Sequence, residues 1–482
     1  MRLAALFGSE AVAPADGADV EITSLTADSR TVVPGALFAA LPGSTADGAA
    51  FVADAIAHGA AAVLLPLETS VSPVSVPVLR AADPRRALAL MAAAFYDRQP
   101  KIMLAVTGTS GKTSVAEFTR QILAGLGRRA ASLGTMGLVT PEGAVYGGLT
   151  TPDPIALHST LARLADEGID HLAFEASSHG LDQRRLDGVR LTAAAFTNLG
   201  RDHLDYHASI DDYFQAKLRL FDILLPSGRP AVVNADGAGA AEVVAVARRR
   251  GLPAIGTGRA GETLKLRDVR PHGFAQHLTV EHDGRVTDIR LPLLGAYQAD
   301  NALLAAGLAV ATGAEAARVL PLLETLIGVK GRLEVVAETR GGLVVVDYAH
   351  KPEALQAALA ALRPFASGRL ICVFGCGGNR DRGKRPVMGR IAAAAADLTI
   401  VTDDNPRRED PAVIRAEILA GAAGAREIAD RGAAIDTAIG LMTAGDVVLI
   451  AGKGHETGQI VGSTVLPFSD HDVVRAALGR PS

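Results

Sequence analysis

The sequence lacks the features that would assign it to several special classes of protein. Among 482 residues it has no tryptophan and two cysteines, Cys372 and Cys376. Two cysteines four positions apart exclude a disulfide framework and a four-cysteine zinc site, and their apolar surroundings favour plain packing. No apolar run approaches the roughly 18 to 20 residues that a membrane-spanning helix needs. We therefore expect a soluble, cytoplasmic protein with no signal peptide and no membrane insertion.

An excess of positive charge is also missing. Lys and Arg total 48 against 52 Asp and Glu, which gives a net charge of −4. Such a chain has no overall basic field to hold nucleic acid. The cluster Arg248, Arg249 and Arg250 is short and lacks interleaved aromatic residues. We expect no nucleic-acid partner, and any phosphate binding must be local.

The chain contains three blocks in which short apolar runs alternate with helical patterns. At roughly 150 residues per domain the length also predicts about three domains, and we place them at 1–97, 98–328 and 329–482. This alternation predicts an α/β fold with helix-covered parallel or mixed sheets, and the third block is typical of a doubly wound, Rossmann-like sheet. A hairpin is predicted at Asp283 and Gly284. The predicted strands are 20–25, 36–41, 60–65, 102–106, 193–196, 343–346, 370–374, 398–401 and 447–451; the predicted helices include one from Pro84, capped by Asp83, and those at 115–126 and 212–221.

A glycine-rich loop gives the strongest local signal. It runs from Gly108 to Ser114 between a predicted strand and a predicted helix, as expected of a phosphate-binding loop in a P-loop ATPase. Backbone N–H groups would surround phosphate oxygens, Lys112 would add a charge and Thr113 could hold Mg²⁺. The loop is shorter than the common G-x4-G-K-[ST] pattern, because Val106 stands five positions before Gly111. A glycine-rich turn that binds nothing is the less favoured alternative.

Two polar segments follow later strands of the same block. One carries Glu175, and the other, at 197–207, is dense in titratable groups and includes His203. Hard oxygen ligands suit Mg²⁺, although either segment alone could be an ordinary polar loop. In the helix that follows, three apolar residues share one face, and from this pattern alone Lys217 would be a surface lysine.

The third block places arginines at two strand ends. Arg380 follows one strand, and Asp404, Asn405, Pro406 and Arg407 follow the next. Arginine binds carboxylates in a bidentate manner. Acids such as Asp404 or Glu456 can accept from an ammonium group. Together these residues predict a pocket for an amino acid.

Ten segments, in this order, carry a resemblance over nearly the whole chain: GTSGKTS, EASSHGL, TNLGRDHLDYH, DYFQAKLRLF, ADNALLA, GRLEVV, VVDYAHKPEAL, FGCGGNRDRGKRP, DDNPR and AGKGHE. The chain thereby resembles the Mur ligases of peptidoglycan synthesis. The resemblance implies a UDP-binding N-terminal domain, a central P-loop ATPase domain and a C-terminal Rossmann-like domain that carries the incoming amino acid. The three blocks drawn above agree with it.

Within the family, the segments are most similar to the members that add meso-2,6-diaminopimelate to UDP-N-acetylmuramoyl-L-alanyl-D-glutamate. This implies an ATP-dependent ligase, acting as a cytoplasmic monomer in cell-wall precursor synthesis. ATP would phosphorylate the D-glutamate side-chain carboxylate, and the amine would attack the acyl phosphate. The DNPR pattern implies this acceptor in particular, because Arg407 would pair with the distal carboxylate that lysine lacks. A roughly thousandfold preference over lysine is expected.

The resemblance also implies roles for individual residues. Catalysis would involve Lys112, His203 and a carbamylated Lys217. Thr113 and Glu175 would hold one Mg²⁺, and His203 and the carbamylated Lys217 would serve a second. ATP would contact Gly108, Thr109, Ser110, Gly111, Lys112, Thr113, Ser114, Asn301, Arg332, Asp347 and His350. The muramoyl-peptide nucleotide would contact Ser29, Thr150, Thr151, Ser177 and Arg185, and diaminopimelate would contact Arg380, Asp404, Asn405, Pro406, Arg407, Gly452 and Glu456. One departure is the loop at 43–48, where some relatives carry His-Gln and this chain offers Ser44 and Thr45 to the uracil.

Other functions remain as alternatives. The D-alanyl-D-alanine-adding ligase and folylpolyglutamate synthetase share the short phosphate loop, but the DNPR segment argues against both. A non-catalytic nucleotide sensor is disfavoured because Lys112, Glu175, His203 and Lys217 are all present.

Overall fold

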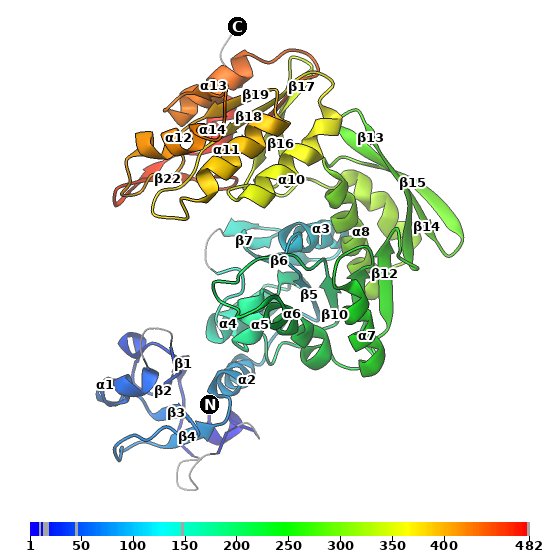
Figure 1. Ribbon diagram of the computed structural model, residues 1–482. Helices are drawn as coiled ribbons and strands as arrows, with labels where there is room; N and C mark the ends of the chain where they lie inside the picture. The colour runs from blue at the N-terminus through cyan, green and yellow to red at the C-terminus, as the bar shows by residue number, and fades with distance from the viewer. Residues whose placement is uncertain (9–10, 13–18, 44–46, 146–148, 480–482) are drawn as a thin grey trace. The chain divides into compact units, whose positions relative to one another are not determined.

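The computed structural model describes residues 1–8, 11–12, 19–43, 47–145 and 149–479, so Ser44 and Thr45 lie outside the described residues (Figure 1). The chain separates into two compact units, Met1–Leu264 with Leu304–Val319, and Lys265–Leu303 with Leu320–Ser482. Both consist of helices and parallel-rich sheets, which confirms the α/β class. The limits of the three expected domains stay a prediction.

The first unit begins with a four-stranded parallel sheet in the order β1-β2-β3-β4. Helix α2 packs on it through Leu88 and Met91, which share a core with strand residues. Its start is as predicted: the Asp83 side chain accepts from the N–H of Arg86, and the helix ends where Asp97 takes a left-handed conformation. The bounds are β1 Ser24–Thr26, α1 Val52–Ala57, β2 Ala36–Ala39, β3 Ala62–Pro66, β4 Val78–Ala81 and α2 Pro84–Tyr96.

The same unit contains a larger sheet ordered β12-β11-β10-β5-β9-β6-β7-β8. Strands β12 to β6 are parallel, and β7 and β8 are antiparallel. Since parallel strands end at one edge of a sheet, the loops after β5, β9 and β10 meet there. The bounds are β5 Ile102–Thr107, α3 Lys112–Gly125, β6 Ala130–Gly134, β7 Gly137–Thr140, β8 Gly143–Val145, α4 Pro154–Asp166, β9 His171–Glu175, α5 Ser178–Asp182, β10 Ala193–Phe196, α6 Ile210–Arg219, β11 Ala231–Asn234, α7 Ala240–Arg250 and β12 Ala254–Gly258.

Helix α6 shows the predicted apolar face. Ser209 caps its start by accepting from the N–H of Asp212, and a π-helical turn at Leu220–Leu224 follows its end. Phe214, Leu218 and Phe221 pack into the core beneath the sheet. This packing fixes which side of α6 faces the sheet edge.

The second unit contains a six-stranded sheet ordered β16-β17-β21-β18-β19-β20, parallel except for β16. Strands β17, β18, β19 and β21 lie where four apolar runs predicted them, whereas the hairpin of β22 and β23 was not expected. The predicted hairpin at Asp283 and Gly284 joins β14 to β15, and both residues have positive φ. The bounds are β13 Leu264–His272, β14 Ala275–His282, β15 Arg285–Leu291, β16 Glu334–Thr339, β17 Gly342–Asp347, α10 Pro352–Leu362, β18 Leu370–Phe374, α11 Lys384–Ala395, β19 Leu398–Val401, α12 Pro411–Leu419, β20 Arg426–Glu427, α13 Arg431–Gly440, β21 Val447–Ala451, β22 Gly458–Val461, β23 Thr464–Pro467 and α14 Asp470–Leu478. Helix α8, Ala296–Ala311, begins in this unit and ends in the first, to which α9, Ala316–Val319, belongs.

Within the described ranges, none of the helices combines the length and the apolar character needed to cross a bilayer.

Candidate active site

The glycine-rich loop after β5 has the form of a phosphate cradle. Gly108 has a φ of +141°, and a Cβ there would lie 1.9 Å from the Thr197 hydroxyl oxygen. Gly111 has a φ of +86° at the position that begins α3. Only glycine tolerates such backbone angles without strain. The Lys112 ammonium donates to the carbonyls of Gly108 and Thr109 at 3.0 and 2.9 Å, so it lies inside the curve of the loop.

The loop after β10 braces this cradle. The Thr197 hydroxyl donates to the Ser110 carbonyl at 2.6 Å, and the Ser110 N–H donates to the Asn198 side-chain oxygen at 3.1 Å. The Asn198 carbonyl accepts from the N–H of Thr109 at 2.8 Å. Thr197 and Asn198 belong to the polar segment 197–207 noted in the sequence. Their contact with the phosphate loop could not be predicted, because it joins positions almost 90 residues apart.

Lys217 is buried, and the interpretation of it as a surface lysine is wrong. Its side chain is 1% exposed, and Nζ donates to the Gly108 carbonyl at 2.8 Å, the same oxygen that Lys112 reaches. Nζ also lies 4.1 Å from the centroid of the Tyr213 ring. Burial, and then the nearby Lys112 charge, lowers the pKa of Lys217 to about 6. The amine is therefore mostly neutral at pH 7.

Tyr213 connects Lys217 with His203. The Tyr213 hydroxyl donates to Thr109 Oγ1 at 3.1 Å, and its ring centroid lies 6.1 Å from that of His203. Burial raises the pKa of Tyr213 to about 12, so the phenol keeps its proton. His203 has a φ of +55°, which is uncommon for a residue with a side chain. His203 and Lys217 thus lie close to the same tyrosine ring, at the edge of the phosphate loop. Tyr213 had not been singled out from the sequence.

Glu175 ends β9 in a tight setting. One carboxylate oxygen accepts from the Thr135 N–H at 2.7 Å and the other from its hydroxyl at 3.3 Å. A Cβ at Gly134 would lie 2.2 Å from the first oxygen, so glycine is required there. Thr135 is a neutral partner that the sequence did not reveal.

Four residues expected to contact the muramoyl-peptide gather beside Glu175. Thr151 Oγ1 donates to the Glu175 carbonyl at 2.9 Å. Ser177 Oγ donates in turn to Thr151 Oγ1 at 3.0 Å. Arg185 donates to the Thr151 carbonyl at 2.7 Å. Thr150 joins through a 3.1 Å contact to the Thr135 hydroxyl. Ser29, the fifth such residue, lies in the 3-10 helix Ser29–Thr31 after β1, which Asp28 caps.

The donor set suits a hard cation. Thr113 offers a hydroxyl and Glu175 a carboxylate whose partners are neutral donors, and oxygen ligands of this kind suit Mg²⁺. Among the described residues, no three His, Cys, Asp or Glu side chains are grouped so as to hold a metal ion by themselves. A Mg²⁺ ion bound here would therefore need further oxygen ligands from outside this group of side chains.

In the second unit, three of the residues expected near the nucleotide gather around Tyr348. The Arg332 guanidinium lies 5.0 Å from the centroid of the Tyr348 ring, and His350 Nδ1 lies 2.8 Å from the Tyr348 carbonyl. Asp347 accepts from the Leu333 N–H at 2.7 Å, while burial raises the pKa of its carboxyl. Asn301 is buried in α8, where its amide donates to Gln298 at 2.9 Å.

A fully buried lysine organises the predicted amino-acid pocket. Lys453 Nζ lies 3.0 Å from Glu456, 3.2 Å from the Asn405 side-chain oxygen and 3.8 Å from Asp404. Asn405 also donates to Glu456 at 2.9 Å. Gly452, with a φ of +117°, leaves room for Asp404, since a Cβ there would lie 2.8 Å from its carboxylate. Lys453 stands in the AGKGHE segment, but its burial gives no signal in the sequence.

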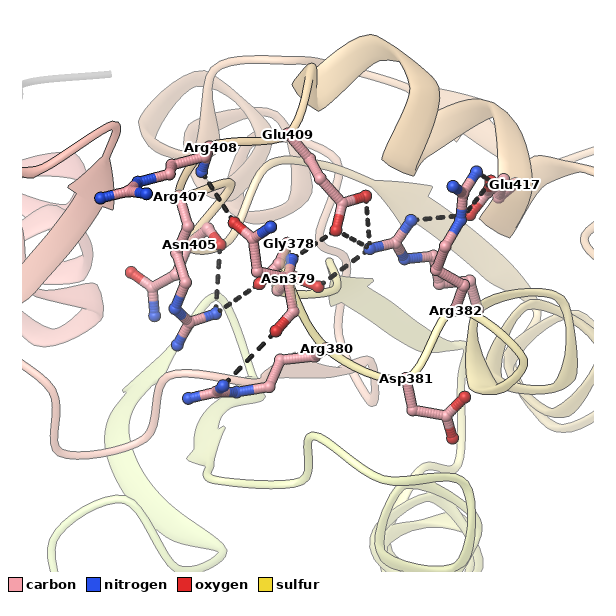
Figure 2. A network of polar contacts seen from close by, with 12 residues as sticks. Gly378, Asn379, Arg380, Asp381, Arg382, Asn405, Arg407, Arg408, Glu409 and Glu417 are labelled. Carbon is pink, nitrogen blue, oxygen red and sulfur yellow. Dashed lines mark hydrogen bonds and ion pairs between the residues drawn. The ribbon is translucent and has the colours of Figure 1, made fainter. Parts of the chain in front are cut away.

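Arg407 is only partly buried, and its guanidinium lies 3.5 Å from the backbone carbonyl of Asn405. Its guanidinium donates to the Gly378 carbonyl at 3.0 Å (Figure 2). The hairpin of β22 and β23 fixes its backbone: the Arg407 N–H donates to the Ile460 carbonyl, and the Arg407 carbonyl accepts from Gly462. Arg380 is exposed on the neighbouring loop and donates to the Asn379 carbonyl at 3.4 Å. Pro406, which directly precedes Arg407 in the chain, is buried. The structure therefore brings the predicted pocket residues onto the loops after β18, β19 and β21.

Comparison with known proteins decides the family. Three family models match successive parts of the chain: the Mur ligase family catalytic domain at 21–96, the Mur ligase middle domain at 106–309 and the Mur ligase glutamate ligase domain at 331–454. A protein of Bradyrhizobium diazoefficiens is 57% identical over 99% of both chains, and its name is UDP-N-acetylmuramoyl-L-alanyl-D-glutamate–2,6-diaminopimelate ligase. The chain belongs to the Mur ligase family. A Brucella melitensis protein of the same name is 56% identical to this Mur ligase over 97% of this chain and 96% of its own.

A solved structure agrees with this assignment. It is described as a UDP-N-acetylmuramoyl-L-alanyl-D-glutamate–2,6-diaminopimelate ligase and is 33% identical to this Mur ligase. It covers 95% of this chain and 94% of its own, with a TM-score of 0.72.

Proposed function

We propose that this Mur ligase uses ATP to join meso-diaminopimelate to the D-glutamate side-chain carboxylate of UDP-N-acetylmuramoyl-L-alanyl-D-glutamate. The observation that carries the proposal is the second-unit pocket, where the Arg407 guanidinium reaches the Asn405 carbonyl and Lys453 holds the Asn405 side chain and Glu456. An arginine and a set of acceptors together suit a ligand with a carboxylate and an ammonium group. The names of the relatives point to the same acceptor.

ATP activates a carboxylate that is otherwise a poor electrophile. The carboxylate oxygen displaces ADP from the γ-phosphorus, and the product is an acyl phosphate. The amine then adds to the carbonyl carbon, loses its proton, and phosphate leaves with the oxygen that it received. Both steps need positively charged groups close to the phosphoryl oxygens, and both need the reactants to be held close together.

Residues of the first unit supply this positioning. The backbone N–H groups of the braced loop and Lys112 bind the phosphates, as the curve of the loop around the ammonium supports. Thr151, Ser177 and Arg185 orient the peptide carboxylate beside Glu175. Thr113 and Glu175 would hold one Mg²⁺, and His203 with a carbamylated Lys217 would hold a second. Such ions would supply further positive charge to the transferring phosphoryl group.

The carbamate on Lys217 forms from its neutral amine. The Nζ lone pair attacks CO₂, an N–C bond forms, and a proton is lost to water, which leaves an anionic group with two oxygens. A depressed pKa supports this reaction, because the neutral amine is the reactive form. In a CO₂-containing buffer, Lys217→Arg should lose at least about a hundredfold in kcat, because guanidinium cannot become an oxygen donor. Lys101→Arg at an exposed position serves as the control, and full activity of Lys217→Arg would refute the carbamate.

The deciding experiment measures phosphate release from ATP with UDP-N-acetylmuramoyl-L-alanyl-D-glutamate, comparing meso-diaminopimelate with L-lysine. We expect turnover with diaminopimelate and a roughly thousandfold lower kcat/KM with lysine. Equal turnover with lysine would retain the ligase and refute the role of Arg407. No turnover with either acceptor would reopen the D-alanyl-D-alanine-adding and folylpolyglutamate reactions.

The proposed reaction places the enzyme in the cytoplasm, where nucleotide-linked precursors and ATP are made. We also propose that it acts as a monomer with small-molecule substrates only, with no nucleic-acid partner. Light scattering after size-exclusion chromatography tests whether the chain is a monomer. A mass near 49.6 kDa is expected, and a stable mass of twice that value would contradict the monomer.

A further inference from the structure

One buried arginine joins the two loops that form the amino-acid pocket. Arg385 begins α11 and has no exposed surface. Its guanidinium donates to the Gly377 carbonyl in the loop after β18 at 3.2 Å. It also pairs with Glu409 at 3.0 Å and with Glu417 of α12 at 2.7 Å. Both terminal nitrogens of this buried guanidinium are paired, with two carboxylates and a carbonyl, so the cation can hold these partners in fixed places.

The two carboxylates differ in what else they contact. Glu409 accepts from the Asn379 N–H in the loop after β18 and follows the DNPR segment closely, as Figure 2 shows. Glu417 instead accepts from Arg382, an exposed side chain. Only Glu409 therefore spans from one pocket loop to the other.

The loops that Glu409 joins approach each other very closely. A Cβ at Gly378 would lie 1.9 Å from the Pro406 carbonyl, and one at Gly377 would lie 2.7 Å from the Arg407 guanidinium. The Asn379 side chain accepts from the Arg408 N–H at 3.0 Å. Asn379 and Arg407 both have a φ of +52°. A backbone conformation of this kind is strained and persists only where the surroundings enforce it.

We propose that Glu409, held by Arg385, is a positioning residue of the amino-acid pocket: it fixes Asn379 and with it the loop after β18, so that Gly378 can hold Arg407 for the incoming diamino acid. This inference rests on the proposed function. The Asn379 hydrogen bond, followed by the Arg385 charge, also holds the pKa of Glu409 below its usual value, so the carboxylate is ionised at neutral pH.

The test compares Glu409→Ala with Glu417→Ala, since each leaves Arg385 with one carboxylate. We expect Glu409→Ala to raise the KM for meso-diaminopimelate about tenfold, as for the loss of one charge-assisted hydrogen bond. The kcat and the KM for ATP should stay within about twofold. Glu409→Gln should restore most of the affinity, because its amide oxygen can still accept from Asn379. Glu417→Ala should leave all constants near those of the wild type.

Amide hydrogen exchange gives a second readout that needs no turnover. Peptides covering residues 377–381 should exchange faster in Glu409→Ala but not in Glu417→Ala. Equal effects of the two variants on the KM, or unchanged exchange in Glu409→Ala, would overturn the inference. If the wild type does not turn over diaminopimelate, the proposed function fails, and the exchange comparison still decides whether Glu409 fixes the loop.

Discussion

At the scale of single residues, the site depends on lysines with unusual surroundings, two of which, Lys217 and Lys453, are buried. Lys217 and Lys112 donate to the same carbonyl of Gly108, and Lys453 is surrounded by three acceptors. Lys453 has carboxylates beside it. Around Lys217, burial and then the nearby Lys112 charge disfavour the charged form.

The burial of Lys217 predicts a pH-dependent cost in stability. Its pKa is lowered from 10.5 to about 6, so the unfolded chain binds more protons than the folded chain between these values. The free energy of unfolding therefore rises with pH across this window, and the cost of the lysine is largest toward its acidic end. In CO₂-free buffer, Lys217→Met should raise the thermal midpoint of the first unit, and by more at about pH 7 than at about pH 9.5.

The control for this prediction is Lys101→Met, at an exposed position. It should shift the midpoint little at either pH. A gain for Lys217→Met that is the same at both values would mean that the lysine keeps an ordinary pKa in the folded state.

At the scale of elements, α6 must be held firmly because it carries Lys217. Asp187, after α5, is 1% exposed and accepts from Arg219 at the end of α6 at 2.7 and 2.8 Å. It also accepts from Arg86 of α2 at 2.7 Å. One carboxylate therefore ties two helices that are more than 100 positions apart in the sequence.

Removal of this charge should be costly. Asp187→Asn leaves a buried arginine without its carboxylate, so we expect the free energy of unfolding of the first unit to fall by about 3 kcal/mol. Asp166→Asn is the matched control, because its ion pair with Arg98 is exposed on both sides. That variant should change stability by less than about 1 kcal/mol. Denaturant titration of both variants measures this, and equal losses would contradict the role of Asp187.

At the scale of the whole molecule, a net charge of −4 is compatible with phosphate binding that is confined to one loop. A ligand that binds only the folded state stabilises it by about 2.7 kcal/mol at a hundredfold excess over its Kd. The stability of the intact chain therefore reports on the proposed ATP and Mg²⁺ sites without any turnover.

A non-hydrolysable ATP analogue with Mg²⁺ should raise the thermal midpoint of the wild-type chain. EDTA should remove most of this gain, and Lys112→Ala should show little gain under either condition. Duplex DNA at physiological salt should leave the midpoint unchanged. A gain that persists in EDTA would show that chain residues alone hold the phosphates.

Much of the architecture could be predicted because it depends on local patterns. Strands β10, β18, β19 and β21 lie at the predicted residues, since buried parallel strands read as continuous apolar runs. The start of α2 follows from Asp83 and Pro84 in the same local way. The strands β16, β22 and β23 were missed, because they are partly or fully exposed and lack a continuous apolar run, although each pairs with a neighbour in sequence.

The fold class, the phosphate loop and the loops that carry the predicted pocket residues could be predicted from the amino-acid sequence, because each depends on residue types at short spacings. The burial of Lys217 and Lys453, the bracing by Thr197 and Asn198, and the contact of Glu409 with Asn379 became evident only in the folded chain. These features depend on which distant segments meet at a sheet edge, and the electrostatic environment of a side chain exists only once those segments have excluded water.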